Sequence, residues 1–443
     1  MKRRDTLKAG AITVFGAAFP FSGVRAQSRY AKYAGKTVVI SVPAHPHYDA
    51  MMKILPEFTK ETGIKVEADK LSMVRIKDKQ LLEMAKPSGD YDLVSYVVMW
   101  KGEYVAKNLI LPLDPFFQNA ALGDPAYDMK DIVPVYLENL GLVGGPKGYL
   151  AGPGARLYGI PYGAETSVLA YRRDIFAKHD LKPPENYDEF RKLLHVLKDK
   201  EGIAALTSRG QAGHQVVHAW LLHLNPLGGS IFDDKWHPRF NDKTGVEALK
   251  FLQEVAATGP AGIPGYGQGE MNTAFLQGQS AMYLDSTSIS GLVNDPSKSK
   301  IVGNVSWALH PKGVHRASES GGLGLAIPKN AGNPDAGFLL MQWLTGKTQD
   351  KAVTMAGGTP TRNSTLRDPD AVRKYPEFIT FVEALKYSDP DWRPIIAGWD
   401  RINVQALGVG LSEALTGKKS AEQALNDMVP QVNAIMREDG YKV

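Results

Sequence analysis

TVVISVPAHPHYDAMMKILPEFTKETGIKVEA, residues 37–68, is the stretch that decides the fold. Residues 37–42 are rich in β-branched side chains, which favour a buried strand. Apolar residues at helical spacing then predict a helix over 48–62, and Gly63 is suited to end it because glycine tolerates the left-handed conformation there. Residues 64–68 resemble a second strand. Strand, helix and strand at this spacing predict a parallel sheet, so we expect an α/β fold.

The chain beyond this unit predicts more elements of the same kinds. A third strand is expected over 91–98. Because ligands of open α/β sheets bind beyond the carboxyl ends of the strands, residues 43–48 and 95–104 are candidate site segments. Further helices are expected over 188–199, 216–224, 244–257, 271–276, 336–344, 403–415 and 421–437, and further strands over 281–284 and 323–327.

Residues 1–26 have the layout of an export signal. Basic residues open the segment, an uncharged run follows over 9–21, and Val24-Arg25-Ala26 offers small residues at a cleavage site. The run is shorter than the roughly 20 apolar residues that a membrane-spanning helix needs. Arg3 and Arg4 resemble a twin-arginine signal, although Thr6 stands where a bulky apolar residue is usual. We expect a cleaved twin-arginine signal, with ordinary secretory export as the alternative.

Charge and cysteine content exclude several classes of function. Loss of residues 1–26 would remove five basic residues and one acidic residue, so the formal net charge would fall from +5 to +1. A near-neutral chain argues against nucleic-acid binding, which needs a basic surface. The sequence has no cysteine, which excludes disulfides, thiolate metal sites and thiol catalysis. It also excludes a lipid anchor attached through cysteine. The remaining length predicts two domains.

Six collinear segments resemble the extracellular solute-binding proteins of ABC importers, in the group that includes maltose-binding protein. PEFTKETGIKVE is similar to the family's first helix and second strand, and YGIPYGAETSVLAYRRDIF to its first passage between lobes. The segments keep the family's order along nearly the whole chain. They are residues 56–67, 91–114, 158–176, 274–291, 321–345 and 411–428.

The resemblance implies two α/β lobes that close on a ligand in the cleft between them. Three crossovers would join the lobes, near Gly163–Ala164, Asp285–Ser286 and Gly321–Gly322. The expected N-terminal lobe is residues 27–163 plus 286–320, and the expected C-terminal lobe is residues 164–285 plus 321–443. The implied protein is a periplasmic monomer without a cofactor or catalytic activity, which delivers its ligand to the permease subunits of an ABC transporter.

The segment MYLDSTSISGLVNDPSKSK, residues 282–300, is most similar to the polyol and monosaccharide binders of the family. We therefore expect a small sugar or polyol as the ligand. Such a ligand needs flat apolar surface for its C–H faces and charged or amide partners for its hydroxyls. The residues expected to supply them are His45, His47, Tyr96, Trp100, Glu165, His218, Asp285, Ser286, Arg362, Trp399 and Asp400.

Other classes of function remain open at this point. A small carboxylate could be held by Arg362 and His45. Histidines at 214, 218 and 223, with the pair at 45 and 47, would suit a metal carrier, although the spacing is loose for zinc. A secreted glycoside-acting enzyme would need a pair of carboxylates at one site, and the sequence assigns no such pair.

Overall fold

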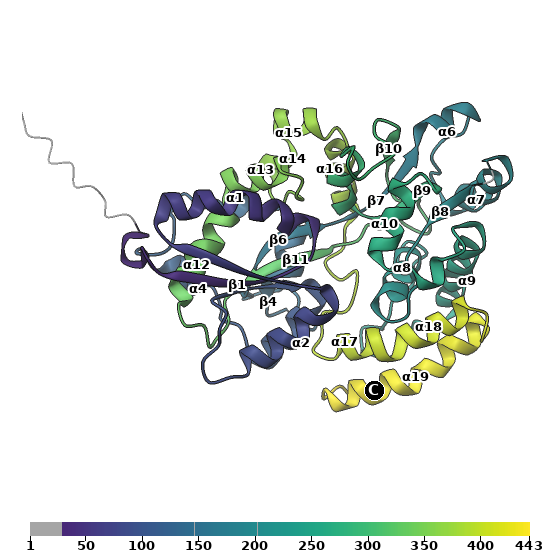
Figure 1. The fold of residues 1–443 in the computed structure, drawn as a ribbon. Coiled ribbons are helices and arrows are strands. Elements are labelled where there is room, and N and C mark those ends of the chain that lie inside the picture. The colour runs from purple at the N-terminus through teal and green to yellow at the C-terminus, as the bar shows by residue number, and fades with distance from the viewer. Residues whose placement is uncertain (1–28, 146, 202) are drawn as a thin grey trace, which may run out of the picture.

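The computed structural model describes residues 29–145, 147–201 and 203–443, which form two lobes side by side (Figure 1). Each lobe is built around its own β-sheet. The expected α/β, two-lobe architecture is therefore confirmed. The expected export signal lies outside the described residues.

The first sheet has the strand order β2-β1-β3-β11-β6. Its strands are β2 (Lys65–Leu71), β1 (Thr37–Pro43), β3 (Leu93–Val97), β11 (Gly321–Ala326) and β6 (Ile160–Glu165). β1 is parallel to β2 and β3, whereas β11 is antiparallel to β3 and β6. The predicted strand–helix–strand unit is confirmed: α1 (Pro46–Thr62) joins β1 to β2, and Gly63 follows it with a φ of 73°.

Helices cover this sheet because each buries an apolar face against it. α2 (Met73–Met84) and α12 (Pro334–Leu344) contact β1, and α1 contacts β2, α12 and α13 (Lys347–Met355). The shorter helices near this sheet are α3 (Lys101–Ala106), α4 (Asp114–Gln118) and α5 (Pro134–Tyr136), with a small hairpin of β4 (Leu142–Val143) and β5 (Arg156–Leu157).

The second sheet has the strand order β10-β7-β9-β8. Its strands are β10 (Val305–Ala308), β7 (Ser167–Arg172), β9 (Ser280–Ser286) and β8 (Ala204–Thr207). α7 (Tyr187–Glu201) and α9 (Lys243–Thr258) pack on β8, α10 (Gln268–Leu276) packs on β9, and α8 (His214–Leu224) packs on α9. Short helices α6 (Arg173–Lys178) and α11 (Ser290–Val293) complete this part.

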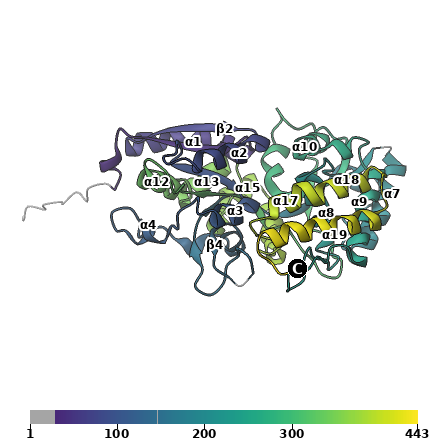
Figure 2. The ribbon, with the colours of Figure 1, turned by 90° about the horizontal axis from the view of Figure 1, so that it is seen from below.

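The C-terminal third of the chain passes along both lobes. α14 (Asn363–Leu366), α15 (Pro369–Lys374) and α16 (Phe378–Ala384) lead to a loop and then to α17 (Trp399–Arg401). A π-helical turn, η8 (Ile402–Leu407), continues into α18 (Gly408–Leu415), and α19 (Ala421–Glu438) is the last helix. α18 and α19 lie against each other and beside α8 and α9 (Figure 2).

Sheet membership corrects the expected lobe boundaries in two segments. Residues 321–326 form β11 at the centre of the first sheet, and α12 packs on that same sheet, so this part belongs with the N-terminal lobe. Residues 305–308 form β10 at the edge of the second sheet, so the segment 286–320 belongs with the C-terminal lobe. The expectation exchanged the two segments because a crossover's position along the sequence does not say which sheet the following strand joins.

Two of the expected crossovers are close to where the chain changes sheet, and one is not. The chain leaves the first sheet after β6, which ends at Glu165, and enters the second with β7, which begins at Ser167. It returns between β10 and β11, just before the expected Gly321–Gly322. The chain does not change sheet at Asp285–Ser286, because β9 ends there and the next strand, β10, belongs to the same sheet. The amide of Thr287 donates to the carbonyl of Thr166 at 2.8 Å, which ties the end of β9 to the first crossover.

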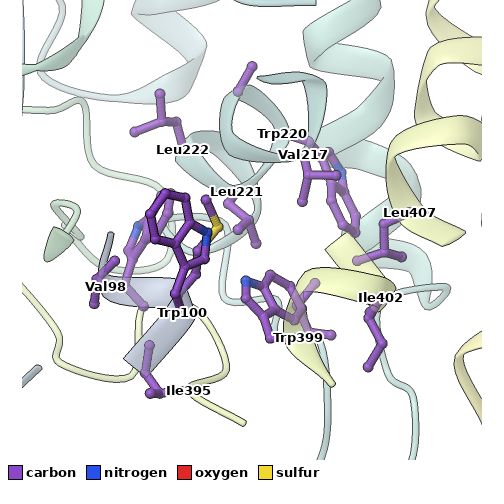
Figure 3. Close-up of a cluster of buried hydrophobic side chains, with 14 of the residues drawn as sticks. Val98, Trp100, Val217, Trp220, Leu221, Leu222, Ile395, Trp399, Ile402 and Leu407 are labelled. Atoms are coloured by element: carbon purple, nitrogen blue, oxygen red, sulfur yellow. The ribbon is translucent and has the colours of Figure 1, made fainter. Parts of the chain in front are cut away.

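A hydrophobic cluster joins the lobes on one side of the crossovers (Figure 3). Trp100, in the 3-10 turn η2 (Val98–Trp100) of the first lobe, lies in one continuous cluster with Ile395 and Trp399 and with Leu221 of α8.

Among residues 29–443, apart from 146 and 202, no helix has the length and apolar character to cross a membrane.

Candidate ligand-binding site between the lobes

A cavity of about 70 Å³ lies between the two sheets at the crossovers. It continues outward into a groove of about 840 Å³, whose walls come from α1 and α2 on one lobe and α10 and α11 on the other. The residues that line the cavity are His45, Met73, Val97, Met99, Glu165, Arg209, His214, Gln215, His218, Gln268, Glu319, Gly322, Leu323 and Arg393.

The first charged group of the cavity is the pair of Arg209 and Asp285. Arg209 follows the carboxyl end of β8, and Asp285 lies near the carboxyl end of the neighbouring parallel strand β9. The guanidinium binds the carboxylate through both Nε, at 2.9 Å, and Nη2. Burial opposes the charge on Asp285, but Arg209 and His218 outweigh it and hold its pKa well below the usual range. The pair is therefore ionised.

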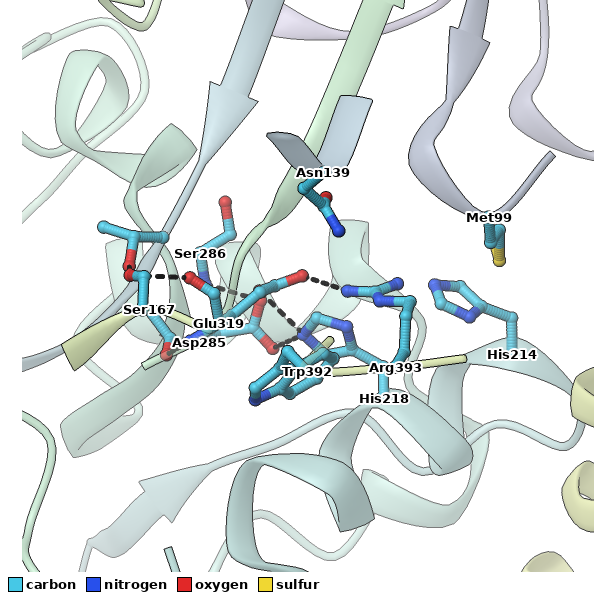
Figure 4. Close-up of polar contacts among 12 residues, drawn as sticks. Met99, Asn139, Ser167, His214, His218, Asp285, Ser286, Glu319, Trp392 and Arg393 are labelled. Carbon is cyan, nitrogen blue, oxygen red and sulfur yellow. Dashed lines mark hydrogen bonds and ion pairs between the residues drawn. The ribbon is translucent and has the colours of Figure 1, made fainter. Parts of the chain in front are cut away.

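A second pair, Arg393 and Glu319, lies on the other side of the same space (Figure 4). Nη2 of Arg393 donates to Oε1 of Glu319, and both side chains are almost fully buried. Glu319 stands two residues before β11, and Arg393 comes from the loop that precedes α17. Among the described residues, Nε of Arg393 and Oε2 of Glu319 have no hydrogen-bond partner.

His218 lies between the two pairs. Its Nε2 is 3.4 Å from Oδ2 of Asp285 and 3.5 Å from Oε2 of Glu319. Its ring packs against Trp392, with centroids 5.4 Å apart. Only 2% of His218 is exposed, and neither ring nitrogen makes a hydrogen bond within the described part of the chain. An imidazole can donate and accept, so it can serve one hydroxyl as acceptor and another as donor.

His45 and Glu165 form the part of the site that belongs to the first sheet. His45 is the residue before α1, and its Nδ1 accepts from the amide of His47 at 3.3 Å. Its Nε2, which therefore carries the proton, lies 3.0 Å from Oε1 of Glu165. Burial opposes ionisation of Glu165, but His45 outweighs it and lowers the pKa of that carboxyl. The carboxylate therefore stays charged inside the cleft.

The opposite wall is apolar. Val97 ends β3 and is the register partner of Leu323 in β11, and Met99 follows in η2. Met73, at the start of α2, stands where the cavity opens into the groove. Leu323 and Met99 are buried, while Met73 is exposed. The cavity thus combines charged groups with a set of aliphatic and thioether groups.

Of the predicted contact residues, His45, Glu165 and His218 line the cavity. Asp285 lies directly behind them, bound to Arg209 and close to His218. Ser286 is fully buried beside Asp285, and its hydroxyl donates to Ser288 at 2.9 Å, so it supports the turn after β9 without lining the cavity.

Three predicted contacts near the first sheet lie outside the lining. His47 is buried against Tyr162, with centroids 4.3 Å apart, and its Nδ1 accepts from the amide of Thr359 at 3.1 Å. Tyr96 lies inside the lobe and donates its hydroxyl to the carbonyl of Leu140. Trp100 packs in the hydrophobic cluster between the lobes. His47 and Trp100 follow strand ends, as expected, whereas Tyr96 lies inside β3, and none of the three side chains lines the cavity.

Three more predicted contacts are held elsewhere. The Arg362 guanidinium donates to the carbonyls of Thr345 and Asp128, both at 2.7 Å, and is fully buried there. Trp399 is part of the hydrophobic cluster. Oδ2 of Asp400 lies 2.7 Å from Nζ of Lys77 on α2, so these two side chains form an ion pair between the lobes.

The sequence reasoning missed most of the polar lining: Arg209, His214, Gln215, Gln268, Glu319 and Arg393. Arg209 could have been found, because it follows a strand that is parallel to β9 and the carboxyl-end rule applies to it. Glu319 stands just before the predicted third crossover. Arg393 carries no such signal, since its loop has no periodic pattern. In the described ranges, no three histidine or acidic side chains are grouped as a metal site.

The chain belongs to the bacterial extracellular solute-binding protein family, whose pattern it matches over residues 44–351. Over 392 residues it is 27% identical to a mannitol-binding protein of Pseudomonas aeruginosa, covering 83% of this chain and 85% of that one. It is 25% identical to a probable amino-acid ABC transporter periplasmic-binding protein of Sinorhizobium fredii, over 100% of this chain and 99% of that one.

Among solved structures, the fold is similar to that of an ABC transporter solute-binding protein of Agrobacterium radiobacter in complex with ribitol. The TM-score is 0.83 at 24% identity, with 91% of this chain and 99% of the other covered. At that identity the likeness shows the fold, which is that of the two-lobe binding proteins.

Proposed function

We propose that this chain is the exported binding component of an ABC importer and that it captures a small neutral sugar or polyol between its lobes. It would deliver the ligand to the permease subunits in the membrane and would catalyse no reaction. The observation that carries the proposal is a group of buried polar atoms at the cavity that make no hydrogen bond among the described residues: both ring nitrogens of His218, Nε of Arg393 and Oε2 of Glu319. Nε2 of His218 and Oε2 of Glu319 are 3.5 Å apart, which is too far for a good hydrogen bond. The group offers both donors and acceptors, which the hydroxyls of a ligand require.

The charges of the site support a neutral ligand. Arg209 is bound to Asp285 and Arg393 to Glu319, so each guanidinium already has a carboxylate. A carboxylate ligand would have to compete with these groups and would also face Glu165. The expectation that Arg362 could hold an acid loses its support, because Arg362 is buried against two carbonyls away from the cavity. Hydroxyls can instead bind the ionised groups without displacing them.

The mechanism would be lobe closure. The groove outside the cavity is lined by α1 and α2 of one lobe and by α10 and α11 of the other, so rotation about the crossovers would narrow it. A ligand that binds the C-terminal lobe's charged groups and the N-terminal lobe's apolar wall favours the closed state by its greater affinity for that state. The mannitol-binding relative and the ribitol complex supply candidate polyols. The relative named as a probable amino-acid binding protein supplies the competing class of ligand.

A thermal-shift screen of the purified protein tests the proposal. Erythritol, ribitol, mannitol, glucose and maltose would be compared with succinate and glycine. We expect at least one neutral compound to raise the melting temperature, since a ligand that binds only the folded state stabilises it. The same compound should reduce the radius of gyration in X-ray scattering. Stabilisation by succinate or glycine alone, or by none of the compounds, would refute a neutral sugar or polyol.

A matched pair of variants ties binding to the cavity. Glu319→Gln weakens the charge-assisted hydrogen bonds and should reduce affinity about 10- to 100-fold in calorimetry. Glu377→Gln changes another buried glutamate, which accepts from Ser290 away from the cavity, and should leave affinity unchanged. Equal affinities of the two variants would place the ligand elsewhere.

A further inference from the structure

The apolar side chains of the cavity all come from one lobe. Hydrogen-bonding side chains come from both lobes: Arg209, His218, Glu319 and Arg393 from the C-terminal lobe and the crossovers, and His45 and Glu165 from the first sheet. The apolar wall, which we define as Met73, Val97, Met99 and Leu323, comes entirely from the N-terminal lobe. A ligand that fills the cavity therefore meets hydrogen-bonding groups over part of its length and hydrocarbon surface where it lies against this wall.

The apolar wall is built into the first sheet. Val97 and Leu323 are register partners on β3 and β11, so their side chains lie next to each other. Met99 follows β3 directly, and its Sδ accepts a hydrogen bond from Nδ2 of Asn403 at 3.4 Å. The thioether thus already has a donor. No side chain of this wall offers a hydroxyl a strong hydrogen-bonding partner.

The cavity lining, as far as the chain is described, includes no Phe, Tyr or Trp. The aromatic side chains that could have covered a sugar ring, those of Tyr96, Trp100 and Trp399, lie in the lobe interior or the inter-lobe cluster. The flat C–H face of a pyranose therefore has no aromatic surface to stack on. Flexible Met and branched aliphatic side chains suit a narrow alkyl group instead.

We infer that the preferred ligand is an acyclic polyol with a hydrocarbon end: adjacent hydroxyls at one end and a methyl or deoxy carbon at the other. This inference rests on the proposed function. A fully hydroxylated alditol carries a hydroxyl on every carbon, so an end that lies against the apolar wall would place a hydroxyl where these side chains offer it no strong partner. Replacing that hydroxyl with hydrogen removes the unpaired group and adds apolar contact.

Calorimetry with matched ligand pairs tests the inference. The pairs are erythritol and 1-deoxyerythritol, ribitol and 1-deoxyribitol, and mannitol and 1-deoxymannitol. In the pair of the right length, we expect the deoxy compound to bind about 10- to 100-fold more tightly, which is the range over which an apolar pocket discriminates against an added hydroxyl. Equal or tighter binding of the parent alditol in every pair that binds would overturn the inference but not the proposed function. Failure of all six compounds to bind would overturn the inference, and it would overturn the proposed function as well only if glucose and maltose also fail in the thermal-shift screen.

Variants of the apolar wall give a second readout. Val97→Thr keeps the side-chain shape and adds a hydroxyl, so it should shift the preference toward the parent alditol at least threefold. Val66→Thr makes the same change on β2, at a half-buried position that does not line the cavity, and should leave both affinities unchanged. An unchanged preference in Val97→Thr would contradict contact between the deoxy end and this wall.

Discussion

Asp285 shows how strongly a single residue of the site depends on its partner. It is 1% exposed and pairs with Arg209, whose pKa is raised by the carboxylate despite burial. Two buried charges are tolerable only when each satisfies the other, because either one alone retains its full desolvation cost. Loss of either member of this pair should therefore affect both the stability of the fold and the binding of the ligand.

Replacement of Asp285 should be costly, and a double replacement should not. Asp285→Asn leaves the Arg209 charge without its counter-ion and should lower the free energy of unfolding by about 3–5 kcal/mol in urea titrations. Arg209→Met combined with Asp285→Leu removes both charges and should recover most of this loss without restoring ligand binding. A single variant as stable as the wild type would mean that water reaches the pair.

Lys101 is a second buried ionisable group, away from the cavity. It is fully buried, and its Nζ donates to the carbonyl of Leu142 at 2.8 Å. Burial lowers the pKa of Lys101 to about 7. Between pH 7 and the unfolded-state value near 10.5, the unfolded chain binds more protons at this group than the folded chain, so stability rises with pH.

The Lys101→Met variant isolates this effect. The wild type should gain up to about 1.4 kcal/mol per pH unit relative to the variant between pH 7.5 and 9.5. Guanidinium unfolding at several pH values measures the difference. Parallel stability curves for the two proteins would show that Lys101 is as easily protonated in the folded state as in the unfolded state.

At the scale of elements, the crossovers decide the geometry of the site. Glu165 ends β6, Asp285 lies near the end of β9 and Glu319 precedes β11, so three strand ends beside the crossovers each place one carboxylate around the cavity. The close approach of two of these strands needs glycine. Gly322 has a φ of +90°, and a Cβ there would lie 2.5 Å from the carbonyl oxygen of Gly163.

Gly322→Ala should therefore destabilise the protein by more than backbone strain alone. A side chain at this φ costs about 1–3 kcal/mol, and the clash with Gly163 adds to it. Gly303→Ala supplies the comparison, because Gly303 has a φ of +74° with nothing within 4 Å of its added Cβ. The melting temperature of Gly322→Ala should be clearly lower than that of Gly303→Ala. Equal melting temperatures would contradict the close contact between Gly322 and Gly163.

At the scale of the whole molecule, burial of neutral histidines sets the response to acid. The pKa of His47 and of His223 is lowered to about 3, and that of His310 to about 4, chiefly by burial. In the unfolded chain these groups titrate near 6.5. The unfolded state therefore binds more protons as the pH falls below that value, and stability is lost progressively toward pH 4.

Above pH 7 we expect these three histidines to contribute almost no pH dependence to the free energy of unfolding. Between pH 6 and 4 the free energy of unfolding should fall by about 1.4 kcal/mol per histidine per pH unit. His47→Asn keeps an acceptor for the Thr359 amide and should make that decline shallower. Chemical denaturation at pH 7, 6, 5 and 4 measures it. An identical decline in wild type and variant would contradict a neutral His47 in the folded state.

Local patterns in the sequence determined the elements and the class of fold. The β-branched run at 37–42, the helical spacing over 48–62 and Gly63 act through neighbouring residues, and the structure contains β1, α1 and β2 there. The same reasoning placed His45 after the first strand, the family resemblance singled out Glu165 at the first crossover, and both line the cavity. The order of segments also identified the family.

Only the tertiary structure decided which sheet β10 and β11 join, which side chains reach the cavity and which are buried. Strand pairing and side-chain direction depend on contacts between residues far apart in the sequence, such as Glu319 with Arg393 or Val97 with Leu323. Trp100 and Arg362 stand at plausible positions in the sequence, yet the first completes an apolar cluster and the second satisfies buried carbonyls. Burial and hydrogen bonding in the folded chain, which no local pattern records, made that choice.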